Sequence, residues 1–231
     1  MASLGLVGTL QHFVETAFLA IAALFAIVNP LGGAPVFLAK TADLSSEERA
    51  GVAKLVAIYG FLLLAGATLI GSHVLDFFDV SIPVVQVAGG IVVCSIGWAL
   101  LNQPNSPIAK SGDAAVAKED PHERAFYPLT MPLTVGPGSI SVAITLAANA
   151  PATNRRLLLT ILAHLTGMLV VSAAVYVCYR YADRILKRLG NTGTIILVRL
   201  SAFILLCIGV QICWNGLRAL LGPLLAGRSP A

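Results

Sequence analysis

The chain has 231 residues, of which 57% are hydrophobic and 11% charged, and its mean hydropathy is +0.86. Soluble domains carry about 25% charged residues, so this composition excludes a soluble globular protein and indicates a membrane protein. The net charge of +4 does not indicate nucleic-acid binding, because the basic residues cluster at the ends of apolar stretches, where they act as a topology signal.

Six apolar stretches are long enough to cross a bilayer as helices, which takes roughly 17 to 25 residues each. They are 12–39, 53–74, 82–101, 126–149, 155–180 and 195–221. The longest polar segment, 102–125, contains Pro104, Pro107 and mixed charges, and we interpret it as a flexible linker. We therefore predict an all-α polytopic membrane protein with six spans, divided into three-helix units at 1–101 and 126–231.

The distribution of Lys and Arg predicts the orientation. Ten basic residues flank the connections after the first, third and fifth spans, and four lie on the opposite side. The ten are Lys40, Arg49, Lys54, Lys110, Lys118, Arg124, Arg180, Arg184, Lys187 and Arg188, and the four are Arg155, Arg156, Arg218 and Arg228. Because short cytoplasmic loops are rich in Lys and Arg, we expect both termini to lie outside the cytoplasm.

The first span contains Asn29-Pro-Leu-Gly-Gly-Ala-Pro35. Proline removes a backbone donor and glycine loosens the backbone, so we expect regular helix to be lost over 29–35. In hydrocarbon, irregular backbone is tolerated only where it is buried in protein or lines a wet cavity.

The same Pro-Leu-x-x-x-Pro pattern recurs 102 residues later at Pro132–Pro137, and we expect the fourth span to lose regular helix over 130–138. Ser95-Ile-Gly97 in the third span also matches Cys207-Ile-Gly209 in the sixth. A repeat of three spans makes the second copy enter the membrane from the opposite side. We therefore predict a 3+3 inverted repeat whose broken spans, the first and the fourth, meet near the bilayer midplane.

A half-helix that begins after each break exposes unpaired N–H groups at a positive dipole end, which suits a carboxylate. We expect Pro35 and Pro137 to occupy the first turns of these half-helices, where no donor is needed. The candidate substrate-binding residues are Asn29, Pro30, Gly32, Gly33, Thr130, Thr134, Gly136, Gly138 and Ser139. They offer amides, hydroxyls and bare backbone without a fixed charge.

No Asp or Glu falls in the middle third of any predicted span. A cationic substrate or a divalent metal would require buried carboxylates. We therefore expect a neutral or zwitterionic substrate and neither a metal nor another cofactor. Sodium can bind freed backbone carbonyls, so coupling to either Na+ or H+ stays open.

Three further polar residues within spans are candidates for coupling or gating. His164 is either a proton carrier or a hydrogen-bonded packing residue. Arg199 either snorkels to the membrane surface or contacts substrate or a gate. Gln211 most simply bonds another helix, with a role in the site as the alternative. Separately, Gly90 and Gly97 share one face of the third span and indicate close helix packing.

Several of these motifs resemble the MarC family of six-span inner-membrane proteins. The resemblance rests on Asn29-Pro-Leu-Gly-Gly-Ala-Pro, the run from Ser81 to Ile91, Met131-Pro-Leu-Thr-Val-Gly-Pro-Gly-Ser-Ile140 and Ile208-Gly-Val-Gln211. It covers nearly the whole chain and implies a location in the bacterial inner membrane, where the termini that the Lys and Arg distribution places outside are expected to be periplasmic. The family is similar to the LysE-type exporters and is linked to transport of small neutral amino acids. It has no catalytic motif to carry over.

The leading functional hypothesis is a secondary transporter of small neutral amino acids or similar zwitterionic metabolites. A passive channel for small polar solutes is the first alternative and would not accumulate its solute against a gradient. An intramembrane enzyme is the second, and the absence of membrane-embedded carboxylates and of an H-E-x-x-H pattern argues against it. An accessory or scaffolding role is the third. The partners expected are a small-molecule substrate, the lipid bilayer and further copies of the chain in a homo-oligomer.

Overall fold

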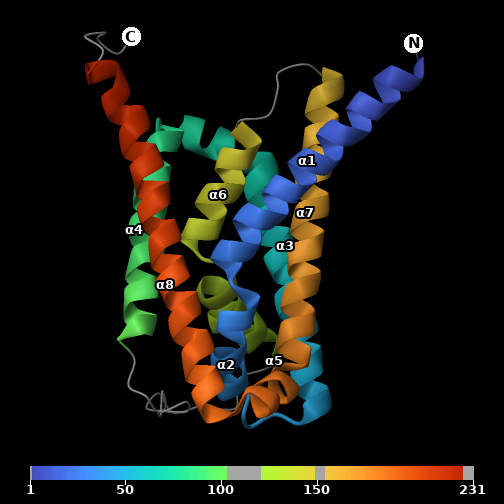
Figure 1. The fold of residues 1–231 in the computed structure, drawn as a ribbon, viewed down its shortest axis with the longest axis vertical. Coiled ribbons are helices and arrows are strands. Elements are labelled where there is room, and N and C mark those ends of the chain that lie inside the picture. Colours follow the sequence, from blue (N-terminus) through green and yellow to red (C-terminus); the bar gives the residue numbers. More distant parts are fainter. Residues whose placement is uncertain (1, 103–120, 149–153, 226–231) are drawn as a thin grey trace.

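The computed structural model describes residues 2–102, 121–148 and 154–225, and within these ranges every regular element is helical. In chain order the elements are α1 (Ala2–Val28), α2 (Pro30–Lys40), α3 (Ser46–Phe77), α4 (Ile82–Leu101), α5 (Pro121–Arg124), η1 (Ala125–Thr134), α6 (Pro137–Ala148), α7 (Asn154–Arg180) and α8 (Ala182–Leu225). The helices pack side by side in one bundle (Figure 1). The fold is therefore the predicted all-helical membrane protein.

Five helical stretches in the described ranges are long and apolar enough to cross a membrane, and a sixth is the pair formed by the α5–η1 segment and α6. The two parts of this pair are bent by 69°. Figure 1 shows them following one another from the end of the bundle that carries α5 to the end where α1 begins and α8 ends. Counted as one broken span, this pair brings the candidate membrane spans of the described residues to the predicted six.

Both termini of the helical bundle lie at the same end, and the described elements that carry the predicted basic clusters end at the other, whereas Lys110 and Lys118 lie outside the described residues (Figure 1). That other end carries the C-terminus of α2 at Lys40, the short helix α5 with Arg124, and the connection from α7 to α8 at Arg180. The relative arrangement agrees with the sequence prediction. Which end faces the cytoplasm stays a prediction.

The break in the first span is narrower than the sequence predicts. Helix is interrupted at Asn29, whose φ of 46° and ψ of 62° are left-handed, and α2 is regular from Pro30 to Lys40. The expected loss of helix over 29–35 is therefore wrong for residues 30–35. Pro30, not Pro35, occupies the first helical position, because a residue there needs no N–H donor. Pro35 lies inside α2, where its ring is buried.

The break in the fourth span begins earlier than the predicted 130–138, and the prediction is wrong for residues 137 and 138, which are helical. Tyr127 and Met131, each followed by a proline in a cis peptide bond, have extended φ/ψ angles inside η1. Val135 is also extended, and regular helix resumes at Pro137, the position expected for the second half-helix. The residue before a proline is pushed toward extended angles, which explains both interruptions within η1.

Helices α4 and α8 approach until their backbones touch. A Cβ on Gly97 would lie 2.8 Å from the backbone nitrogen of Leu206, and one on Gly209 would lie 2.7 Å from that of Cys94. Gly90 is equally close to the backbone of Cys213, at 2.6 Å. The predicted packing role of Gly90 and Gly97 is thus confirmed, because only residues without a side chain allow this approach.

The bundle has a packed centre and an apolar exterior. Phe37, Leu64, Leu129, Met168 and Tyr179 are fully buried at its centre. Many large apolar side chains are exposed on the outside of α3, α4 and α8. An exterior of this kind is stable only against lipid, in agreement with six spans through a bilayer. The division into repeats at 1–101 and 126–231 stays a prediction.

Candidate functional site

A cavity of about 310 Å³ lies between the two broken spans. Pockets for small ligands start at about this size. Its lining residues are Ile27, Val28, Asn29, Gly32, Gly33, Val36, Lys40, Val93, Ile96, Leu100, Pro128, Pro132, Leu133, Thr134, Gly136, Gly138, Ser139 and Leu205. One wall is aliphatic and comes from α4 and α8, and the polar groups come from the two breaks. The cavity therefore brings together elements from both halves of the chain.

Asn29 shapes the cavity where the first span breaks. Its Oδ1 accepts a hydrogen bond from the N–H of Gly32 at 3.1 Å and so caps α2. Asparagine suits this position because it tolerates left-handed angles and is among the best N-caps. The Nδ2 group, which the cap does not use, carries two N–H donors. Asn29 thus combines a structural role with a polar group in the cavity lining.

The hydroxyls of the second break donate hydrogen bonds to backbone carbonyls of the same segment. Thr130 Oγ1 donates to the carbonyl of Ala125 at 2.6 Å, and Thr134 Oγ1 donates to that of Leu129 at 2.7 Å. Ser139 Oγ donates to the carbonyl of Gly136 at 2.9 Å. Each hydroxyl has used its proton in this way and keeps lone pairs that accept hydrogen bonds. Toward a ligand, Thr134 and Ser139 therefore act as acceptors.

The first turn of α6 opens onto the cavity. Gly136, Gly138 and Ser139 are among the lining residues, and α6 begins at Pro137. The backbone N–H groups of a first helical turn have no partner within the helix, and they carry positive potential. The α2 terminus differs, because Asn29 occupies one of its N–H groups. Of the two predicted anion-binding helix ends, the end of α6 is the less occupied by its own chain.

Tyr179 of α7, which the sequence analysis missed, connects the two breaks. Its ring stacks on Phe37 with centroids 4.4 Å apart. Its hydroxyl lies 3.0 Å from Thr134 Oγ1 and directly beside Gly33, where an added Cβ would lie 2.5 Å from the oxygen. Because the Thr134 proton points to Leu129, the Tyr179 hydroxyl donates to Thr134. A tyrosine near a span end looks like an interfacial anchor, so its sequence position gave no signal of this burial.

Lys40 is the one charged residue among the cavity-lining residues, which include neither Asp nor Glu. The sequence analysis used Lys40 for orientation but not for the site. It ends α2, one helical turn beyond the lining residue Val36, at the end of the bundle that carries the basic clusters. The electrostatic potential of the cavity is therefore positive from both Lys40 and the first turn of α6.

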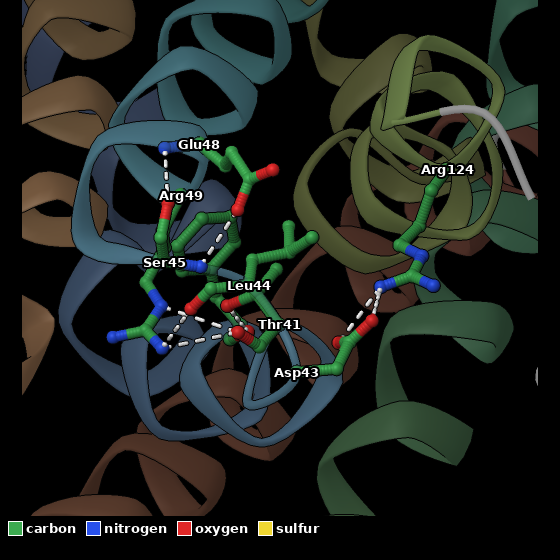
Figure 2. Close-up of polar contacts among 8 residues, drawn as sticks. Thr41, Asp43, Leu44, Ser45, Glu48, Arg49 and Arg124 are labelled. Carbon is green, nitrogen blue, oxygen red and sulfur yellow. Dashed lines mark hydrogen bonds and ion pairs between the residues drawn. The ribbon is translucent and has the colours of Figure 1, made fainter. Parts of the chain in front are cut away.

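A cluster of polar contacts surrounds the α2–α3 connection, which follows Lys40 in the chain (Figure 2). Arg124 places one nitrogen 2.9 and 2.8 Å from the two carboxylate oxygens of Asp43. The Arg124 side chain is 9% exposed and that of Asp43 is 54% exposed. The hydrogen bond from Arg124 holds the pKa of Asp43 below its ordinary value. This ion pair ties the start of the fourth span to the end of the first.

The α2–α3 connection has its own supports within the same cluster. Arg49 donates to the carbonyls of Thr41 at 3.1 Å and Leu44 at 3.1 Å, and so satisfies the C-terminal end of α2 (Figure 2). Ser45 and Glu48 form a capping box that starts α3. The connection is thus held in one conformation by side chains.

Seven of the nine predicted substrate-binding residues line the cavity. They are Asn29, Gly32, Gly33, Thr134, Gly136, Gly138 and Ser139. Pro30 and Thr130 are buried beside it and are not among the lining residues. Thr130 faces the backbone that its hydroxyl bonds. Any role of these residues toward a substrate stays a prediction.

The three candidates for coupling or gating lie away from the cavity lining. His164 is buried in α7, and its Nδ1 has no hydrogen-bond partner within the described residues. Arg199 is exposed on α8. Gln211 is also exposed and bonds Asn215 of the same helix, not another helix as expected. No cluster of three or more potential metal ligands occurs in the part of the chain that the structure describes.

Comparison with known proteins gives one consistent result. Residues 14–221 match the family described as MarC family integral membrane proteins. A UPF0056 membrane protein of Methanocaldococcus jannaschii is 34% identical over 92% of this chain and 98% of its own length. The UPF0056 inner membrane protein MarC of Salmonella paratyphi A is 32% identical over 86% of this chain and 92% of its own. The UPF0056 membrane protein YvbG of Bacillus subtilis is 29% identical over 85% and 92%, respectively. No solved structure matches the chain.

Proposed function

Because this chain belongs to the MarC family of integral membrane proteins, we propose that it is a secondary transporter of small neutral amino acids or similar zwitterionic metabolites. The single observation that carries the proposal is the cavity of about 310 Å³ between the two broken spans. Paired broken helices near the midplane are where secondary transporters bind substrate.

The polar groups of the cavity match the two ends of a zwitterion. The first turn of α6, at Gly138 and Ser139, offers N–H donors and positive potential to a carboxylate. The hydroxyl oxygens of Thr134 and Ser139, whose protons are engaged, accept from an ammonium group. The remaining wall is aliphatic and suits a small uncharged side chain.

The charge distribution supports a substrate whose net charge is not positive. Lys40 adds to the positive potential of the cavity, and no lining residue is acidic. A second ammonium or guanidinium group on a substrate would therefore be desolvated without a partner. The proposal assigns no chemical reaction to the protein.

The proposal also includes the orientation of the protein in the membrane, its coupling ion and its oligomeric state. We place both termini in the periplasm, so that Lys40 lies at the cytoplasmic end of the bundle. Coupling to Na+ or H+ and assembly as a homo-oligomer belong to the same proposal.

Uptake into proteoliposomes tests the proposal. We expect radiolabelled alanine or glycine to accumulate above the external concentration when an inward Na+ or H+ gradient is imposed. Equilibration without accumulation under either gradient would support the passive channel instead. Absence of any uptake of neutral amino acids would contradict the proposed substrate class.

A matched pair of variants connects this assay to the cavity. A Cβ on Gly136 would meet only the carbonyl of Pro132, a tight contact at 3.2 Å, so Gly136→Leu requires a small local shift and places its side chain at the cavity lining, and its folding is checked by thermal unfolding. Gly51 is exposed on α3 with nothing within 4 Å, so Gly51→Leu is the control. We expect transport to fall at least tenfold in the first variant alone. Equal transport by both variants would show that the cavity is not the substrate-binding site.

A further inference from the structure

The connection between α7 and α8 carries a second surface with a defined chemistry. Gly190, at φ 66° and ψ −176°, interrupts α8 and separates its first eight residues, Ala182–Leu189, from the membrane-crossing part. These angles are accessible essentially to glycine alone. The first residues of α8, here called the α8 arm and defined as residues 182–189, therefore form a distinct helical segment at the basic end of the bundle (Figure 1).

The α8 arm has an inner and an outer face. Ala182 is fully buried, and Leu186 packs against the central core. Tyr181, Arg184 and Arg188 follow one another at helical spacing and are exposed. The backbone bond from Ile185 to Tyr181 continues the helix across the corner. The outer face is therefore held in place by the packing of the inner face.

Positive charge is concentrated on this outer face. Arg180, Arg184, Lys187 and Arg188 are all exposed, and Asp183, which pairs with Lys187 at 2.7 Å, is the one acidic residue among them. The segment 180–188 thus carries three net positive charges. At 1.5 Å per helical residue it extends over about 12 Å.

The guanidinium groups of two of these arginines lie close to the same aromatic ring. Arg184 lies 5.4 Å and Arg180 lies 6.0 Å from the centroid of the Tyr181 ring. Tyr181 and Leu189 expose 40% and 42% of their surface, which places apolar atoms beside the charges. Tyrosine and leucine next to arginine fit the boundary between headgroups and acyl chains. Planar guanidinium groups bind phosphate oxygens in pairs.

We propose that the outer face of the α8 arm binds the phosphate headgroup of an anionic phospholipid, with Arg184 and Arg188 as the ligands of the phosphate and Tyr181 positioning Arg184. A positive-inside signal requires only that basic residues lie in this connection, not that they share one face beside exposed apolar side chains. The inference rests on the proposed orientation, in which this end of the bundle faces the negatively charged cytoplasmic leaflet, and that charge complementarity selects the lipid as the occupant.

Lipid retention by the purified full-length protein tests this site. Native mass spectrometry after exchange into detergent with equal phosphatidylglycerol and phosphatidylcholine measures which lipid stays bound. We expect the wild type to retain phosphatidylglycerol and Arg184→Gln/Arg188→Gln to retain at least threefold less. Arg184→Lys/Arg188→Lys keeps the charge and is expected to retain an intermediate amount.

The matched control removes two exposed arginines at the other end of the bundle, in Arg156→Gln/Arg218→Gln. We expect this variant to retain phosphatidylglycerol as the wild type does. Equal loss in both glutamine pairs, or equal retention of phosphatidylcholine by the wild type, would overturn the proposal. Displacement of the lipid by millimolar glycerol phosphate would also overturn it, because the site would then be one for a soluble phosphate ester. Circular dichroism of each variant verifies that the helices are intact.

Discussion

The hydroxyl of Tyr179 donates a hydrogen bond to Thr134 Oγ1 at 3.0 Å, and this contact joins α7 to the second break. Both residues are buried, and Thr134 passes its own proton to the carbonyl of Leu129. The chain from Tyr179 to Leu129 thus supports backbone that η1 leaves without regular helical bonds. Buried polar chains of this kind stabilise one arrangement when every member is satisfied.

We expect Tyr179→Phe to destabilise the protein by about 1 kcal/mol, because the ring keeps its stacking on Phe37 and loses one hydrogen bond. Thermal unfolding in detergent of Tyr179→Phe, Thr134→Val and the double variant forms a cycle. A coupling energy near zero would show that the two hydroxyls do not interact. Tyr181→Phe, at the exposed corner, serves as the control.

Gly33→Ala is expected to lower both stability and transport. A Cβ at this position would lie 2.5 Å from the Tyr179 hydroxyl, so the ring must shift away from Thr134. Overpacking of this kind costs about 1 to 3 kcal/mol. Gly66→Ala in α3 is the control, because nothing lies within 4 Å of its Cβ. A melting temperature of Gly33→Ala equal to that of Gly66→Ala would contradict the close packing of Tyr179.

Two substitutions at Asn29 separate its structural and polar roles. Asn29→Ala removes the cap of α2 and places alanine at φ 46°, and we expect a loss of about 1 to 2 kcal/mol. Asn29→Gly accepts these angles and weakens the cap by only a few tenths of a kcal/mol. If the side-chain amide contacts substrate, Asn29→Gly folds normally and transports less in the proteoliposome assay. Unchanged transport by Asn29→Gly would restrict this residue to capping.

The Arg124–Asp43 pair is expected to contribute to stability in a pH-dependent way. The folded pKa of Asp43 is lowered, so its contribution is present above the unfolded pKa of about 3.9 and is lost as the pH falls through the folded value. Asp43→Asn leaves Arg124 buried without its charged partner, and we expect a loss of about 1 to 3 kcal/mol near neutral pH.

The acid limb of thermal stability measures this contribution. We expect the difference between wild type and Asp43→Asn to shrink as the pH is lowered below about 4. Asp183→Asn breaks an exposed pair within one helix and is expected to change stability by less than about 0.5 kcal/mol. A difference for Asp43→Asn that is constant from pH 7 to pH 3 would exclude the carboxylate as its origin.

The positive potential of the cavity predicts which solutes compete for it. Lysine and arginine bring a charge that no cavity-lining carboxylate neutralises, and Lys40 repels it. We expect them to inhibit uptake of labelled alanine at least tenfold more weakly than glycine, alanine or serine do. In Lys40→Gln, the difference in inhibition between basic and neutral amino acids should be smaller. Equal inhibition by basic and neutral amino acids would refute the charge argument.

Much of the fold follows from local properties that a sequence displays. The span 82–101 coincides with α4, and the fifth span, 155–180, differs from α7 by one residue at its start. Hydropathy and span length decide these limits because lipid requires every backbone bond to be satisfied within a helix. The proline patterns likewise located both breaks, since a missing N–H has its effect within one turn.

The extent of each break was not visible in the sequence. The two proline patterns are equivalent in spacing, yet the first break occupies one residue, whereas the second interrupts the helix at Tyr127, at Met131 and again at Val135. The first is confined because Asn29 caps α2 and Pro30 begins it. The second is extended because Pro128 adds a further interruption upstream, and the hydroxyls of Thr130 and Thr134 bond carbonyls within the segment.

The sequence by itself determined the membrane class, the six spans, the family resemblance and seven residues of the cavity lining. Tertiary structure decided that Tyr179 lies against Gly33 and that Lys40 lines the cavity. It also paired Arg124 with Asp43, 81 positions apart. Hydropathy and proline chemistry act on neighbours along the chain, whereas these contacts depend on how separate helices pack, which no local pattern encodes.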